Sequence, residues 1–125
     1  MTGYTTNIEN KTIQNEFYRK VLFTGKKIQL VVMSIRVGED IPLETHPKTD
    51  QFIRIEKGTA FVKIGEEEHT LNEDEIVIIP AGNPHYVKNA SPTKVLKLYS
   101  LYAPPEHPDG TIHKTCKDAA KAEHH

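Results

Sequence analysis

Two short segments of the 125-residue chain carry side chains that could bind a metal ion. Glu44 and His46 stand two positions apart, and side chains at that spacing on an extended chain point to the same face. His85 follows the turn 80–84, rich in proline and glycine, which would aim a second strand end at the same point. Two imidazoles and one carboxylate form the facial triad of metal sites that keep coordination positions open. We therefore predict one divalent ion, Fe, Mn, Zn or Ni, bound by Glu44, His46 and His85.

Gln51 opens the next apolar run and offers an amide oxygen, which makes it the predicted fourth ligand. The residues leave two roles open for Glu44, because its carboxylate could bind the ion or swing away to act as a base. An acid or base outside the ligand set is harder to find. The candidates are three tyrosines, together with two histidines that reach the site only if the C-terminal segment folds over it: Tyr86, Tyr99, Tyr102, His107 and His113.

The elements that would position these side chains are short β-branched and aromatic runs separated by turn residues. Such runs at intervals of about 8–12 residues are typical of an all-β sandwich or barrel, and their short connections predict antiparallel neighbours. The run 75–79 is almost continuously apolar, which predicts a strand buried on both faces. The expected strands span residues 18–23, 28–37, 51–56, 60–64, 67–71, 75–79, 85–89 and 95–102.

Strand alternation sorts the side chains near Gln51 into two faces. If Gln51 points inward, Phe52 and Arg54 point outward and are better placed for a subunit interface than for catalysis. Apolar strands at the edge of a small barrel need covering, so we predict a homodimer. The residues expected to wall the cavity are Ile53, Ile55, Val62 and Ile64.

The segment around Glu44 resembles the first sequence motif of the cupin superfamily. That motif runs Gly, five residues, His-x-His, three or four residues, Glu, six residues, Gly. In this chain Gly38, His46 and Gly58 stand at matching positions. Glu44 stands in place of the first histidine and Gln51 in place of the glutamate, so one carboxylate remains in the set but at another vertex.

The segment around His85 resembles the second cupin motif, which runs Gly, five residues, Pro-x-Gly, two residues, His, three residues, Asn. Pro80, Gly82, His85 and Asn89 match, and Asp74 replaces the leading glycine. The resemblance covers residues 28–102. It implies an all-β double-stranded β-helix, the jelly-roll barrel of small single-domain cupins, and a homodimer.

The resemblance also implies metal-dependent chemistry on a small oxygen-rich molecule such as a sugar, a keto acid or an enol. Ligand sets that contain glutamine occur in cupins of the mannose-6-phosphate isomerase type and in cupins that act on unsaturated uronates. Isomerisation fits, and so does oxygen-dependent cleavage if the metal is Fe(II). The alternative is a non-catalytic cupin that binds or senses a small ligand, which the lack of an obvious acid or base favours. A purely structural scaffold would leave the ligand cluster without a purpose.

Composition excludes several other classes of function. The formal net charge is −1, so no basic field exists to attract nucleic acid or an anionic membrane surface. The longest apolar runs are far shorter than the roughly 20 residues that span a bilayer. Residues 1–11 are polar and lack the apolar core of a secretory signal, so we expect a cytoplasmic protein. The single cysteine, Cys116, cannot form an internal disulfide.

The length matches one domain, and we expect residues 1–125 to form a single unit with a barrel core at about 17–103. The C-terminal arm, 104–125, begins with a segment whose prolines exclude a central strand. Residues 116–123 are rich in alanine and lysine, which predicts a short helix. His124 and His125 could be the remnant of a purification tag and do not enter the chemical argument.

Overall fold

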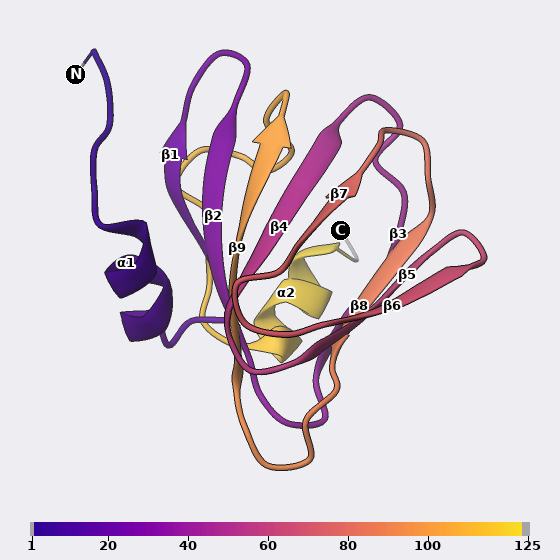
Figure 1. Cartoon of the computed structure of the whole chain (residues 1–125). Helices are drawn as coiled ribbons and strands as arrows, with labels where there is room; N and C mark the ends of the chain where they lie inside the picture. Colours follow the sequence, from indigo (N-terminus) through magenta and orange to yellow (C-terminus); the bar gives the residue numbers. More distant parts are fainter. Residues whose placement is uncertain (1, 124–125) are drawn as a thin grey trace.

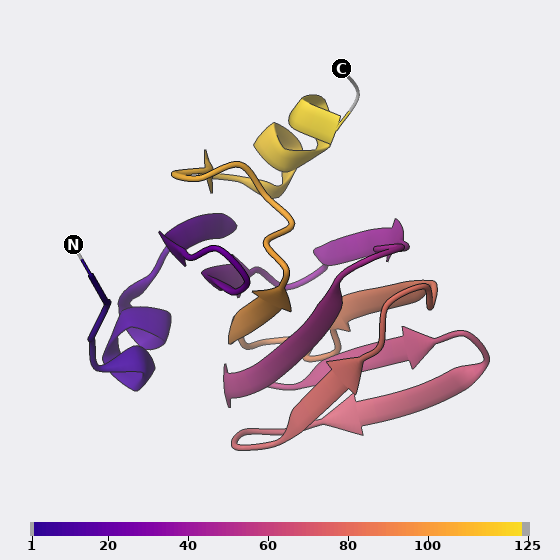
Figure 2. The same cartoon turned by 90° about the horizontal axis from the view of Figure 1, so that it is seen from above.

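Two antiparallel sheets face each other in the computed structural model, which describes residues 2–123 (Figures 1 and 2). The larger sheet has the strand order β10-β1-β2-β9-β4-β7, and the smaller has the order β3-β8-β5-β6. The all-β jelly-roll arrangement predicted from the sequence is confirmed. The strands are β1 Arg19–Thr24, β2 Gln29–Ile35, β3 Asp40–Glu44, β4 Asp50–Lys57, β5 Ala60–Ile64, β6 Glu67–Leu71, β7 Ile76–Ile79, β8 His85–Asn89, β9 Leu96–Ala103 and β10 Ile112–His113, and the helices are α1 Ile8–Gln14 and α2 Cys116–Glu123.

The core lies between the two sheets and follows from strand alternation. On β4, Gln51, Ile53 and Ile55 are buried, while the residues between them are partly exposed. Aliphatic side chains of β2, β5, β8 and β9 fill the remaining space. The four residues predicted to wall the cavity, Ile53, Ile55, Val62 and Ile64, all belong to this core.

Strand β3 was not predicted, because Gly38 and Pro42 are residues typical of a break between strands. The strand lies at the edge of the smaller sheet and pairs with β8 alone, and its register shifts between Ile41 and Glu44. Proline is tolerated at edges and bulges because it need not donate to a ladder there. The strand matters for function because Glu44 is its last residue.

Helix α1 and strand β10 were also not predicted, whereas α2 confirms the predicted helix. In α1 the side chain of Asn7 accepts a hydrogen bond from the backbone N–H of Asn10, a standard N-cap. The helix packs on the outer face of the larger sheet against β2, β4 and β9. Strand β10 pairs with the edge of β1 and so ties the C-terminal arm to the sheet. Among the described residues no helix is long and apolar enough to cross a membrane.

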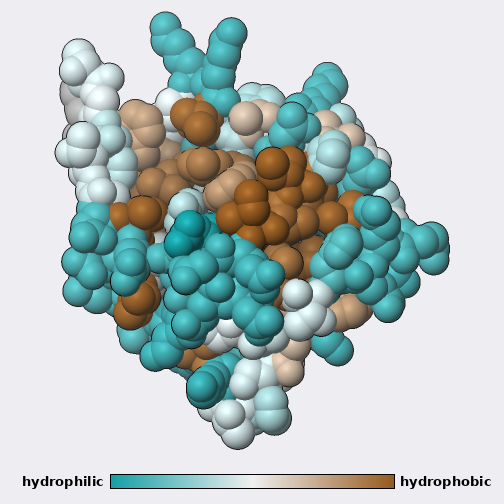
Figure 3. Space-filling model, viewed as in Figure 1, coloured by the Kyte–Doolittle hydropathy of each residue, from teal (hydrophilic) through white to brown (hydrophobic). Residues whose placement is uncertain are grey.

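The prediction that both faces of residues 75–79 are buried is wrong. Ile76 is 46 % exposed and Ile78 is 59 % exposed. The reason is topological, because β7 is the last strand of the larger sheet and its outer face has no covering element among residues 2–123. Figure 3 shows hydrophobic surface gathered over β4 and β7.

An apolar row crosses the outer face of the larger sheet at this level. Each residue of the row pairs directly with the next one on the neighbouring strand. Phe52, one of the two predicted interface residues, belongs to the row. A second copy of the chain could cover this row. Homodimerisation therefore fits the exposed row and stays a prediction. Light scattering behind size-exclusion chromatography at micromolar concentration tests it, and a monomeric mass would contradict it. The row runs Phe23, Leu30, Leu101, Phe52, Ile78.

Gly58 is the turn position at which a side chain is least tolerated. Its φ is +92°, and an added Cβ would lie 2.6 Å from the backbone oxygen of Val95. We expect Gly58→Ala to lower the free energy of unfolding by about 3 kcal/mol or more, because it combines a left-handed conformation with a clash against backbone. Gly82→Ala is the matched control, since φ is +87° but the space is open, and should cost only about 1–2 kcal/mol. Urea unfolding of both variants measures the difference, and equal losses would contradict the steric argument.

Candidate metal centre

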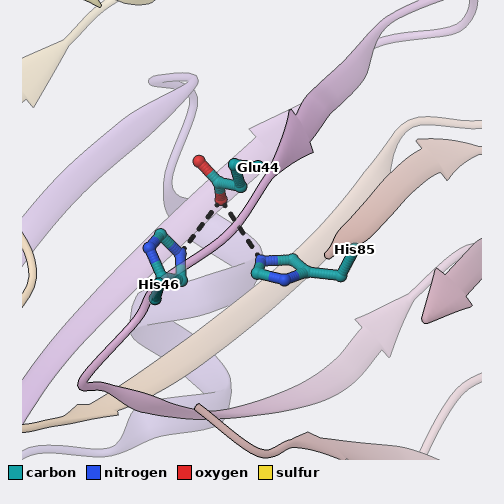
Figure 4. Close-up of side chains that lie close together, drawn as sticks. All are labelled: Glu44, His46 and His85. Carbon is teal, nitrogen blue, oxygen red and sulfur yellow. Dashed lines mark ion pairs between the residues drawn. The ribbon is translucent and has the colours of Figure 1, made fainter. Parts of the chain in front are cut away.

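Glu44, His46 and His85 converge between the ends of β3 and β8 (Figure 4). Strand pairing explains part of this arrangement, because Glu44 and His85 are direct partners in the ladder. The Oε1 atom of Glu44 lies 3.2 Å from Nε2 of His46 and 3.5 Å from Nε2 of His85. Both histidines are buried, whereas about a quarter of the Glu44 side chain is exposed, so the site opens to solvent on the carboxylate side.

The other ring nitrogen of each histidine has a partner that can only accept a hydrogen bond. Nδ1 of His85 lies 2.9 Å from the carbonyl oxygen of Asn83. Nδ1 of His46 lies 2.9 Å from Oε1 of Glu106. Each Nδ1 must therefore carry a proton, which leaves Nε2 of the neutral imidazole with a lone pair. The two lone pairs and the Glu44 carboxylate all face one small volume.

The donor set fits a divalent cation. Neither Nε2 atom makes a hydrogen bond of acceptable geometry, although both are buried. Ligand atoms about 2.1 Å from an ion lie about 3.0 Å apart at octahedral angles and about 3.4 Å apart at tetrahedral angles. The separations of 3.2 and 3.5 Å from Glu44 Oε1 match that spacing. An ion between these atoms would remove the repulsion between three facing electron pairs.

The protonation of the site without a metal follows from the same contacts. Burial raises the pKa of Glu44, but the contacts with His46 and His85 outweigh burial and hold this pKa at about 2. Burial lowers the pKa of His46, but Glu44 and then Glu106 outweigh it, so this pKa lies above its ordinary value. A metal ion would thus compete with a proton on Nε2 of His46, and its binding should weaken as the pH falls.

Gln51, the predicted fourth ligand, lies on the inner face of β4 and is almost fully buried. Its Nε2 donates to Oγ of Ser100 at 3.3 Å and to the hydroxyl of Tyr102 at 3.2 Å. Its Oε1 is buried and has no hydrogen-bond partner. Two neighbours therefore fix the amide and leave its oxygen available, as a ligand atom would be. The role of Gln51 as a ligand stays a prediction.

Of the three predicted tyrosines, the structure brings only Tyr102 to the site. Its ring meets the His46 ring edge-on at 5.8 Å between centroids. Burial raises its pKa, so the phenol keeps its proton at neutral pH and can donate but not act as a base.

Tyr86 and Tyr99, the other two predicted proton donors, lie on the faces of their strands that point away from the site. Tyr86 follows the inward-facing His85 and points to the other face of β8, where its hydroxyl donates to Oδ2 of Asp40 at 2.8 Å. Tyr99 alternates with inward residues of β9 and packs against Phe52 on the outer face of the larger sheet.

The C-terminal arm does fold over the site, and it brings a residue that was not predicted. Glu106 contacts His46, and the His107 ring meets the Tyr102 ring edge-on at 5.2 Å. His113 lies farther along the arm, with Nδ1 3.0 Å from Nη1 of Arg19. The only local signal for Glu106 was a carboxylate beside His107 within a run of prolines.

His107 makes the stability of the metal-free protein depend on pH. Burial, and then the nearby Arg19 charge, lower its pKa from 6.5 to about 4. Its contribution to stability is complete above pH 6.5 and is lost as the pH falls from 6.5 towards 4. His46 has the opposite sign, because its raised pKa stabilises the fold at low pH. We expect His107→Gln to reduce the loss of unfolding free energy between pH 7 and pH 5 by about 2 kcal/mol.

Urea unfolding in the presence of a chelator measures this effect. His69 of β6 supplies the control, because His69→Gln makes the same substitution at an exposed position. A His107→Gln profile identical to that of the wild type would refute the assignment.

Comparisons with known proteins place the chain among close relatives. Residues 31–102 match the model of the family described as Cupin domain. Uncharacterized protein YrkC of Bacillus subtilis is 48 % identical over 126 residues, which cover 96 % of this chain and 67 % of the relative. Uncharacterized protein L612 of Acanthamoeba polyphaga mimivirus is 46 % identical over 87 % of this chain and 70 % of its own length. The crystal structure of BH2720 from Bacillus halodurans superposes with a TM-score of 0.92 at 44 % identity, covering 94 % of this chain and 93 % of that one.

Proposed function

The chain belongs to the cupin domain family, and from that membership and the site geometry we propose that it holds one divalent metal ion and acts on a small oxygen-rich molecule. The ion is Fe, Mn, Zn or Ni, and the substrate is a sugar, a keto acid or an enol. One observation carries the proposal: the Nε2 atoms of His46 and His85 converge on the Glu44 carboxylate while their Nδ1 atoms are occupied elsewhere. The cytoplasmic location stays a prediction.

The roles of the side chains follow from their protonation. Glu44, His46 and His85 would hold the ion, with Gln51 Oε1 as the fourth ligand. A bound divalent ion polarises a carbonyl or enediolate oxygen, and with Fe(II) it also permits oxygen-dependent cleavage. Tyr102 keeps its proton and is placed to donate a hydrogen bond to a ligand beside His46. Isomerisation of the mannose-6-phosphate isomerase type would need a base as well, and Glu44 would supply it only in the alternative role, with its carboxylate swung away from the ion.

A non-catalytic binding or sensing role is the second candidate, and the protonation states of Tyr102 and His107 favour it. The phenol of Tyr102 has a raised pKa and the imidazole of His107 a pKa of about 4. Tyr102 therefore stays protonated at neutral pH, and His107 is too weak a base, so neither group serves as the general base there. A site of this kind can orient and bind an oxygen-rich ligand without turning it over.

The test begins with protein purified without added metal or chelator. Elemental analysis should find close to one divalent ion per chain, or calorimetry should show uptake of Fe(II) under anaerobic conditions, Mn, Zn or Ni. The loaded protein is then incubated with aldoses, keto acids and enols, with proton NMR and an oxygen electrode as readouts. Turnover in any class supports the enzyme, and saturable binding without turnover supports the second candidate. A protein that takes up none of the four metals would overturn the proposal.

A further inference from the structure

The C-terminal arm reaches the metal centre through the carboxylate of Glu106. Glu106 Oε1 lies 2.9 Å from Nδ1 of His46, a hydrogen-bond distance, although the two residues stand far apart in the sequence. The other ring nitrogen of His46, Nε2, faces Glu44. His46 is thus placed between two carboxylates, one on each of its nitrogens. Because Glu44 belongs to the ligand set, Glu106 is the carboxylate whose role the proposed function leaves open.

A carboxylate behind a metal-binding histidine has a definite effect. It holds the proton on the nitrogen that faces it, directs the lone pair of the other nitrogen to the ion and raises the basicity of the ring. For His85 the backbone carbonyl of Asn83 does the same. The carbonyl belongs to the turn itself and cannot be lost by mutation, whereas the partner of His46 is a side chain on a separate segment.

Glu106 is held in place by a buried glutamine of the barrel. Oε1 of Gln29 accepts from the backbone N–H of Glu106 at 3.1 Å and from that of His107 at 3.0 Å. Nε2 of Gln29 donates to the backbone oxygen of His107 at 2.7 Å and to Oγ1 of Thr24 at 2.9 Å. All four hydrogen-bonding positions of the amide are therefore in use, three of them on the arm. Gln29 is fully buried, which makes this contact rigid.

We infer that Glu106 is a positioning residue for His46, held by Gln29, and that the arm is therefore part of the metal centre. The inference rests on the proposed metal site for its functional meaning. Its structural content, the proton on Nδ1 of His46, does not depend on whether an ion binds.

Two variants of Glu106 separate a positioning role from a packing role. Glu106→Gln keeps an oxygen that can accept from Nδ1, and Glu106→Ala removes it. Asp109→Asn is the control, because it removes a charge from an exposed position of the same arm. We expect Glu106→Ala to weaken metal binding by about 10–100-fold, with Glu106→Gln between Ala and the wild type and Asp109→Asn unchanged.

The deciding measurement is the tautomer of His46 in metal-free protein at alkaline pH, where the ring is neutral. Long-range ¹H–¹⁵N correlation spectra of histidine-labelled protein report it, with His46→Gln to assign the resonances. We expect Nδ1–H in the wild type and in Glu106→Gln, and a mixture of tautomers in Glu106→Ala.

Two results would overturn the inference: an unchanged tautomer in Glu106→Ala, or metal affinity in that variant within about threefold of wild type. The first result decides the inference even if the protein binds no metal. Failure of the proposed function is the separate result that the wild type takes up no ion while the tautomer still follows Glu106.

Discussion

Replacing His85 with alanine is expected to weaken the binding of divalent metal by more than about 100-fold. Structural zinc sites bind with about 10–16 kcal/mol, so one of four ligands contributes on the order of 3 kcal/mol, which corresponds to a factor of that size. His85 is 2 % exposed and its Nδ1 is fixed by Asn83, so no other side chain of β8 can take its place without moving the strand end. Calorimetric titration of the metal-free protein measures the loss.

The control for this prediction is His69→Ala, since His69 is exposed on β6 and lies outside the group of Glu44, His46 and His85. Because His85→Ala also opens a gap in a buried region, His85→Gln serves as a second variant that keeps most of the volume. Both His85 variants should bind the ion more weakly than the wild type while their circular dichroism spectra remain those of a β-rich fold. Retention of metal by His85→Gln and His85→Ala alike would remove His85 from the ligand set.

Replacing Gln29 with methionine is expected to release the C-terminal arm from the barrel. Methionine has a similar length and no hydrogen-bonding groups, so it leaves the backbone groups of Glu106 and His107 without their partners. Each buried polar group left in this way costs about 1–3 kcal/mol, and the arm avoids part of this cost by moving into water. We expect the free energy of unfolding to fall by about 2–4 kcal/mol. Metal affinity should fall by the same factor as in Glu106→Ala, because the same carboxylate is withdrawn.

Urea unfolding and limited proteolysis are the measurements, with new cleavage expected within residues 104–111. Gln14→Met is the matched control, since Gln14 is exposed at the end of α1 and the same substitution there removes no buried contact. Equal protease resistance of Gln29→Met and wild type, with unfolding free energies within about 0.5 kcal/mol, would show that the arm is held by other contacts.

The convergence of Glu44, His46 and His85 could be predicted because its signal is local. Glu44 and His46 are two positions apart, and His85 follows a turn whose composition marks a strand start. The three side chains do lie together as expected, although β3 itself was not predicted. The same parity excludes Tyr86, since a residue that follows an inward-facing histidine must point outward.

Glu106 and Gln29 could not be found in the same way, because their signal is not local. The contact between His46 and Glu106 depends on where the arm lies after β9 ends, and no periodicity governs an irregular, proline-rich segment.

The exposure of Ile78 on β7 could not be predicted from local sequence either. A continuous apolar run reports hydrophobic residues, but whether its strand is central or at an edge is decided by topology.

The hydrogen bonds from Gln29 go to main-chain atoms of the arm, not to its side chains. Amino-acid replacements at positions 106 and 107 therefore leave the attachment intact while they change what the arm presents to the barrel interior. Evolution of a new ligand preference could proceed by exchanging these side chains one at a time, without first rebuilding the element that carries them. The position of the arm on the barrel is in this sense independent of the side chains that the arm carries.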